Sequence, residues 1–137
     1  MSASLSRISL GLLAAIFALL GIGILIDPQA VQEAHGLDFS TTPASGMAEI
    51  RAYYFGSLVT FSWLLSRGAR GGSSLDERRL GLMIAAMVLL LFVAGRLVSY
   101  VLDGPPRNRH AEVMWAAELV GGAAALALLR SDVKQKS

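Results

Sequence analysis

The sequence of 137 residues contains no cysteine and little charge. The absence of cysteine excludes disulfides and thiolate metal sites. Only 16% of the residues are charged, whereas soluble domains have about 25%. The net charge of +2 at pH 7 is small, and we expect no nucleic-acid partner. Hydrophobic residues make up 54% of the chain, which indicates an integral membrane protein with a single domain over residues 1–137.

Long apolar stretches occur at four places, residues 8–26, 47–65, 80–102 and 113–129. A helix needs about 20 apolar residues to cross about 30 Å of hydrocarbon, and each stretch comes close to that length. Because backbone groups cannot stay unpaired in lipid, the stretches should be helices. The sequence therefore predicts an all-α fold, a bundle of four transmembrane helices in contact with the lipid bilayer.

The first apolar stretch could instead be a secretory signal peptide, with Arg7 as its basic region. However, the stretch is long for a signal core, and Asp27-Pro28 follows where a small-residue cleavage site would be expected. These two features favour a retained span.

The connecting segments carry signals for helix starts and ends. Ser74 and Glu77 have the spacing of a capping box at the start of the third helix. The Asp-Gly-Pro-Pro sequence of residues 103–106 would end that helix. In the first connecting segment, Asp27-Pro28 predicts a short interfacial helix over residues 28–35.

The basic residues are distributed unevenly between the two sides of the predicted bundle. One precedes the first stretch, four lie between the second and third, and three follow the fourth. The opposite side has two, between the third and fourth stretches. Because Lys and Arg in short loops favour the cytoplasm, both termini are predicted to be cytoplasmic. The expected location is the cytoplasmic (inner) membrane of a bacterium, with the first and third connections facing the periplasm.

Charged side chains enter the apolar stretches near their outer ends. Arg96 lies about 10 Å of helix before Asp103, and Glu118 about 9 Å after Glu112. Glu49 and Arg51 occupy the first turns of the second stretch, with Tyr54 close behind, so three helices should bring polar groups to one layer of the outer leaflet. The predicted cluster contains Glu49, Arg51, Tyr54, Arg96, Asp103 and Glu118.

Two interpretations of this cluster remain open: an ion-pair network that fixes helix register, and a ligand-binding site. An unpaired charge at mid-span costs about 2.5–3.5 kcal/mol, so the charges should pair inside the bundle. Arg96 is the natural partner for Glu118 or Glu49, because its planar fork can hold a carboxylate with two bonds. Gly121 and Gly122 would allow a neighbouring helix to approach closely beside Glu118.

No cofactor or metal is expected. His35 and His110 lie in outward connections without the tight spacing of metal ligands. Motifs for phosphoryl transfer, haem or dinucleotide binding are not found, and the serines of the spans have no histidine within credible reach.

The segment Glu49-Ile-Arg-Ala-Tyr-Tyr-Phe-Gly56, together with Gly95-Arg96, Asp103-Gly104 and Glu118, resembles the bacterial domain-of-unknown-function family 4345. The likeness covers nearly the whole chain. It implies a short four-helix membrane protein with no assigned reaction, and it implies that the polar cluster is a family feature. Phe55 departs from the pattern, which often has a glycine there.

The expected role is the binding of a lipophilic or small anionic ligand by this cluster. Glu49 and Glu118 would be acid/base or ligand carboxylates, Arg96 would position one of them or bind an anionic group, and Asp103 and Tyr54 would line the mouth. One alternative is a non-catalytic subunit or assembly factor, with a membrane-protein partner or a second copy of the chain. Another is a membrane-embedded enzyme acting on a lipophilic substrate. A monomeric channel is disfavoured, because the spans are apolar below the cluster.

Overall fold

The computed structural model is all-α and describes residues 2–29, 48, 50–103 and 109–134. Its elements are α1 (Ser2–Ile26), the π-helical turn η1 (Arg51–Phe55), α4 (Gly56–Ala69), α5 (Leu75–Asp103) and α6 (Arg109–Lys134). Within the described residues there are thus four α-helices, one at each predicted apolar stretch, and three of them are long.

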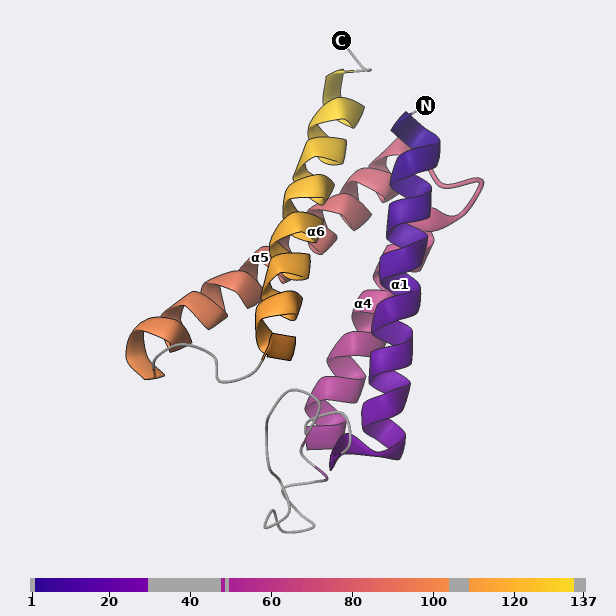
Figure 1. The fold of residues 1–137 in the computed structure, drawn as a ribbon. Coiled ribbons are helices and arrows are strands. Elements are labelled where there is room, and N and C mark those ends of the chain that lie inside the picture. Colours follow the sequence, from indigo (N-terminus) through magenta and orange to yellow (C-terminus); the bar gives the residue numbers. More distant parts are fainter. Residues whose placement is uncertain (1, 30–47, 49, 104–108, 135–137) are drawn as a thin grey trace.

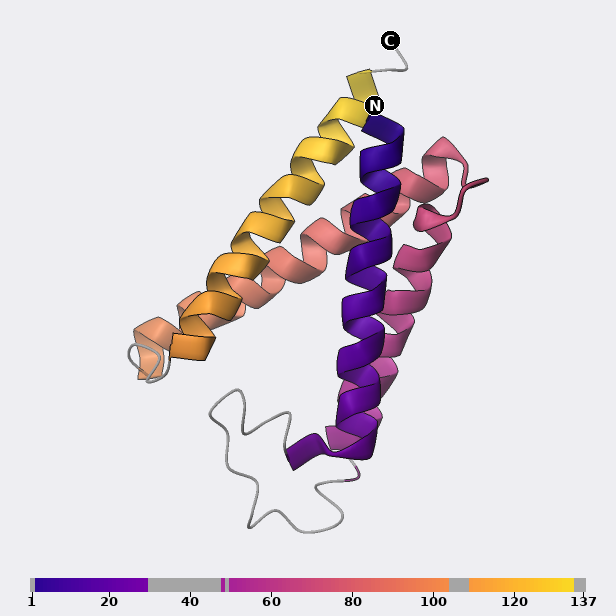
Figure 2. The same ribbon diagram turned by 45° about the vertical axis from the view of Figure 1, so that its right-hand side comes forward.

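The helices form two antiparallel pairs, α1 with α4 and α5 with α6 (Figure 1). The two chain termini lie at the same end of the molecule, which we call the terminal end (Figures 1 and 2). In both views the two pairs approach each other toward the terminal end and diverge toward the opposite end, which we call the open end. The molecule is therefore a wedge rather than a parallel bundle.

Glycines allow the close packing at the terminal end. Leu10 of α1 is completely buried, and a Cβ atom at Gly68 would lie only 2.8 Å from its Cδ1 atom. A Cβ atom at Gly81 of α5 would lie 3.1 Å from the same methyl group. A Cβ atom at Gly68 would also lie 3.0 Å from the carbonyl oxygen of Glu77 in α5, so these glycines set how closely the two pairs meet.

Three of the helices contain segments long and apolar enough to cross a membrane: Ala3–Ile26, Leu75–Leu102 and Glu112–Ser131. The remaining helix differs from the prediction of a span over residues 47–65. Its α-helical part, α4, has 14 residues, begins after the π-helical turn and continues to Ala69. Helix α4 alone is too short to span a bilayer, but η1 leads directly into it.

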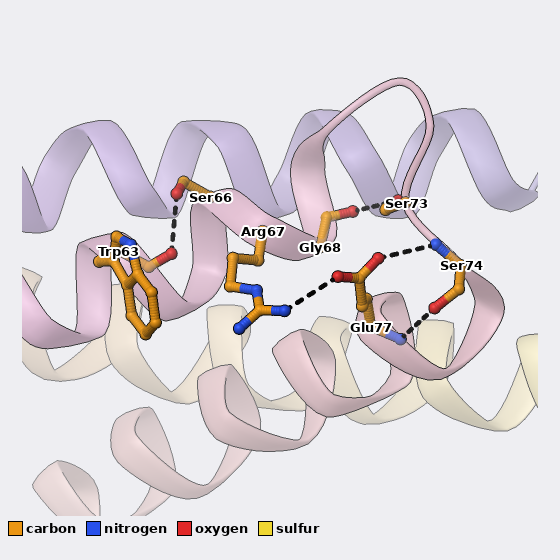
Figure 3. Close-up of polar contacts among 7 residues, drawn as sticks. All are labelled: Trp63, Ser66, Arg67, Gly68, Ser73, Ser74 and Glu77. Atoms are coloured by element: carbon orange, nitrogen blue, oxygen red, sulfur yellow. Dashed lines mark hydrogen bonds and ion pairs between the residues drawn. The ribbon is translucent and has the colours of Figure 1, made fainter.

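The predicted capping box at the start of α5 is confirmed (Figure 3). The Ser74 backbone N–H donates to Glu77 Oε2 at 3.0 Å, and the Glu77 N–H donates to Ser74 Oγ at 3.1 Å. Arg67, at the end of α4, donates to the other oxygen of Glu77 at 3.3 Å. These contacts join α4 to α5 through the short turn. Helix α5 ends at Asp103 as predicted, whereas the predicted interfacial helix lies outside the described residues apart from Pro28 and Gln29, which are helical.

Candidate functional site

A two-bonded ion pair joins α5 to α6. Arg96 Nε donates to Glu118 Oε2 at 2.8 Å, and Arg96 Nη2 donates to Glu118 Oε1 at 2.9 Å. The Glu118 side chain is 8% exposed and that of Arg96 is 36% exposed. This parallel arrangement is the strongest geometry that an arginine and a carboxylate can adopt. The prediction that Arg96 pairs with Glu118 or Glu49 is therefore confirmed for Glu118.

The pair forms because α5 and α6 approach each other closely one turn nearer the terminal end. A Cβ atom at Gly122 would lie 2.9 Å from Leu90 Cγ, and one at Gly121 would lie 3.0 Å from Leu89 Cδ1. The missing side chains let the leucines of α5 sit directly against the backbone of α6. Residues four apart share a helix face, so Glu118 points the same way as Gly122, toward α5.

Aromatic rings support the pair on its open-end side. Tyr100 and Trp115 have ring centroids 6.2 Å apart and an interplanar angle of 37°. Tyr100 is one turn beyond Arg96, and Trp115 is three residues before Glu118, so the ring contact and the ion pair form two successive links between α5 and α6.

A half-open cavity of about 730 Å³ lies between the two helix pairs, with walls from α1, η1, α4, α5 and α6. This volume falls in the range of about 300–1,000 Å³ that is usual for ligand pockets. Most of the lining is apolar. Along α1 it extends from Leu13 to Ile24, a distance of about 16 Å, or roughly half the hydrocarbon thickness.

The polar groups of the cavity are not distributed evenly along it. Toward the terminal end the walls are side chains such as Leu13, Phe17 and Leu89. Arg96 and Glu118 lie further toward the open end, where Tyr54, Ser99 and Met114 also line the cavity. The cavity thus has an apolar inner part and a polar outer part. This distribution matches that of an amphiphilic molecule, which has one apolar and one polar end.

The π-helical turn presents Tyr54 to this cavity. In the same turn, Arg51 Nε donates to the carbonyl of Leu25 at 3.3 Å. This carbonyl belongs to the last turn of α1, whose terminal carbonyls have no partner within the helix. Ser57 Oγ donates to the carbonyl of Tyr54 at 3.1 Å, which satisfies a backbone group near the irregular turn. π-Helical turns occur frequently at functional sites.

Three of the predicted site residues line the same cavity, whereas a fourth makes its contact elsewhere. Arg96, Glu118 and Tyr54 line one cavity, whereas Arg51 contacts the end of α1. Glu49 lies outside the described residues, and only the backbone of Asp103 is described. Sequence reasoning did not identify Ser99, or any of the α1 residues that form one wall. No sequence signal marks the α1 residues, because an apolar residue that faces lipid resembles one that faces a cavity.

In the described part of the chain, no group of three or more His, Cys, Asp or Glu side chains could hold a metal ion. Of the two histidines considered above, His35 lies outside the described residues, and the side chain of His110 is not described.

Searches of curated proteins and of solved structures gave no significant match. The family model described as "Domain of unknown function (DUF4345)" matches residues 5–129. The matched region contains all four α-helices nearly in full, together with the ion pair and the cavity. The chain therefore belongs to the DUF4345 family.

Proposed function

We propose that this protein is a multi-pass membrane protein that binds one lipophilic ligand between its two helix pairs. The apolar part of the ligand would occupy the inner part of the cavity, and its polar group would meet Arg96 and Glu118. The observation that carries the proposal is the cavity itself, which combines about 730 Å³ of mainly apolar space with a paired arginine and glutamate on one wall.

The proposed membrane placement has four crossings, with both termini in the cytoplasm and the open end in the outer leaflet. The uneven distribution of basic residues supports this orientation. Support for the crossing by η1 and α4 comes from its apolar composition and from its side-by-side packing with α1, a candidate span. In this placement the exposed apolar side chains of α1, α5 and α6 would contact lipid, which explains why so many of them are uncovered.

The hydrogen bonds that Glu118 accepts favour ligand binding over catalysis. Both of its oxygens accept hydrogen bonds from Arg96, so taking up a proton from a substrate would weaken a two-bonded ion pair. Transport is disfavoured because the inner part of the cavity is apolar. A purely structural ion pair would be best shielded from the cavity, whereas the Arg96 side chain lines it and stays 36% exposed.

The ligand site can be tested by filling the cavity. Ala117 lines the cavity on α6, and its neighbour Ala116 is exposed and does not line it. Wild type, Ala117→Phe and Ala116→Phe would be purified in mild detergent and examined by native mass spectrometry for retained lipophilic molecules. We expect wild type and Ala116→Phe to retain the same molecule and Ala117→Phe to lose it. Equal retention in all three proteins, or none in the wild type, would contradict the proposal.

The orientation can be tested separately, because the chain has no cysteine of its own. Gly71 lies in the turn between α4 and α5, and Glu112 lies in the first turn of α6; both are exposed. With a membrane-impermeant thiol reagent added to intact cells, Glu112→Cys should be labelled from the periplasm. Gly71→Cys should be labelled only after the inner membrane is permeabilised. The opposite pattern would refute the orientation.

A further inference from the structure

The ion pair also has consequences for the kind of polar group that the cavity can accept. Building on the proposed function, we propose that the cavity selects a lipophilic ligand whose polar group is an uncharged hydrogen-bond acceptor, such as a ketone, ester or quinone carbonyl. The carrying observations are the pairing of Arg96 with Glu118 on the cavity wall, the unequal burial of the two side chains, and the apolar remainder of the cavity.

Neither an anionic nor a cationic head group matches the charge of this site. Arg96 and Glu118 neutralise each other, so the wall offers no net charge to a ligand. An anionic group would either displace Glu118 from the arginine or place a second negative charge beside a carboxylate that is 8% exposed. A cationic group would have to draw Glu118 away from Arg96 in the same way. Breaking a buried pair from either side is unfavourable.

Hydrogen-bond donors are nevertheless present on the wall. A guanidinium carries five N–H groups and has no acceptor, and Glu118 receives two of them. Among the described residues, the Arg96 side chain makes no hydrogen bond besides these two. Tyr54 also lines the cavity, and its side chain carries a hydroxyl donor. A ligand that supplies an acceptor without charge can therefore meet these donors without disturbing the pair.

The rest of the cavity restricts the ligand to one with a long apolar part. The inner walls consist of aliphatic and aromatic side chains such as Leu13, Phe17 and Leu89. They offer no partner for a second polar group, so polar groups at both ends of a ligand would leave one of them buried and unsatisfied. The selected molecule is thus a single-headed amphiphile that lies with its acceptor toward the open end.

The test compares probes that share a dodecyl chain and differ only in the head: a methyl ketone, a sulfonate, a trimethylammonium group, and dodecane with no head. Binding would be measured with the protein in lipid nanodiscs, with affinities referred to the probe concentration in the bilayer so that partitioning cancels. The Ala117→Phe protein supplies the background. We expect the ketone to bind at least about tenfold more tightly than each of the other three probes.

The variant Glu118→Gln sharpens this test, because it keeps the shape of the side chain and releases the charge of Arg96. Its preference should change from the ketone to the sulfonate, whereas Glu112→Gln, at an exposed position in the first turn of α6, should keep the wild-type preference. Equal affinities for all heads, or a wild-type preference for either charged probe, would overturn the inference and leave the lipophilic site standing. Failure of every probe to bind above the Ala117→Phe background would overturn the proposed function as well. If Glu118→Gln does not fold, the wild-type series alone still decides.

Discussion

Replacing Arg96 by glutamine should destabilise the protein by about 3 kcal/mol. Two unit charges about 4 Å apart attract each other by about 4 kcal/mol at the effective dielectric of 20 that suits protein sites. Removing one member of a buried pair typically costs about 3–5 kcal/mol, because the other charge is left uncompensated. We take the lower end of that range because the Arg96 side chain is 36% exposed. The charge left behind would be that of Glu118, which is nearly fully buried.

The reverse substitution, Glu118→Gln, should destabilise the protein less. It leaves the charge on Arg96, whose long side chain is partly exposed and can move toward the open end. The double variant Arg96→Met with Glu118→Leu removes both charges and keeps apolar volume. It should lie within about 1 kcal/mol of the wild type or exceed it in stability, since hydrophobic replacement of a buried pair is often neutral or better.

The three variants can be compared by reversible unfolding in mixed micelles, in a Trp63→Phe background, so that fluorescence reports Trp115, which lies three residues from Glu118. Arg67→Gln is the matched control, because its pair with Glu77 is 48% and 38% exposed and should contribute much less. If Arg96→Gln behaves like Arg67→Gln, the ion pair does not hold α5 to α6. If the losses of the two single variants simply add in the double variant Arg96→Gln with Glu118→Gln, the two side chains do not interact.

Three further outcomes follow from the packing and the helix ends. Gly122→Ala should lower the free energy of unfolding by about 1–3 kcal/mol, because the new Cβ atom would overlap a leucine of α5. Gly95→Ala is the control, because a Cβ atom there meets nothing within 4 Å, and it should be neutral or slightly stabilising in the same unfolding assay. Ser74→Ala removes the side-chain cap of α5 and should lower the free energy of unfolding by about 1 kcal/mol. An unchanged midpoint of unfolding would argue against the capping box. Arg51→Ala should accelerate hydrogen exchange in the last turn of α1 by removing the hydrogen bond to the Leu25 carbonyl, and equal exchange rates would contradict that contact.

The sequence was sufficient to predict the helical class, the positions of the helices and several of their ends. Hydropathy is a local property that adds along the chain, so runs such as residues 80–102 predict a helix without reference to any neighbour. The capping box of Ser74 and Glu77 is equally local, since its two hydrogen bonds connect residues three positions apart. The prediction for α4 was less accurate, because a π-helical turn has no clear signature in an apolar sequence.

Tertiary structure was needed to identify the partner of Arg96 and to reveal the cavity. The sequence offered both Glu49 and Glu118 as acids at a similar depth. The contact that brings Glu118 to Arg96 depends on how α6 crosses α5, which the packing of Leu89 and Leu90 against Gly121 and Gly122 determines. The cavity arises because the two helix pairs meet at one end and diverge at the other (Figure 2). Crossing angles result from contacts between residues distant in sequence, and no local pattern of hydrophobicity contains them.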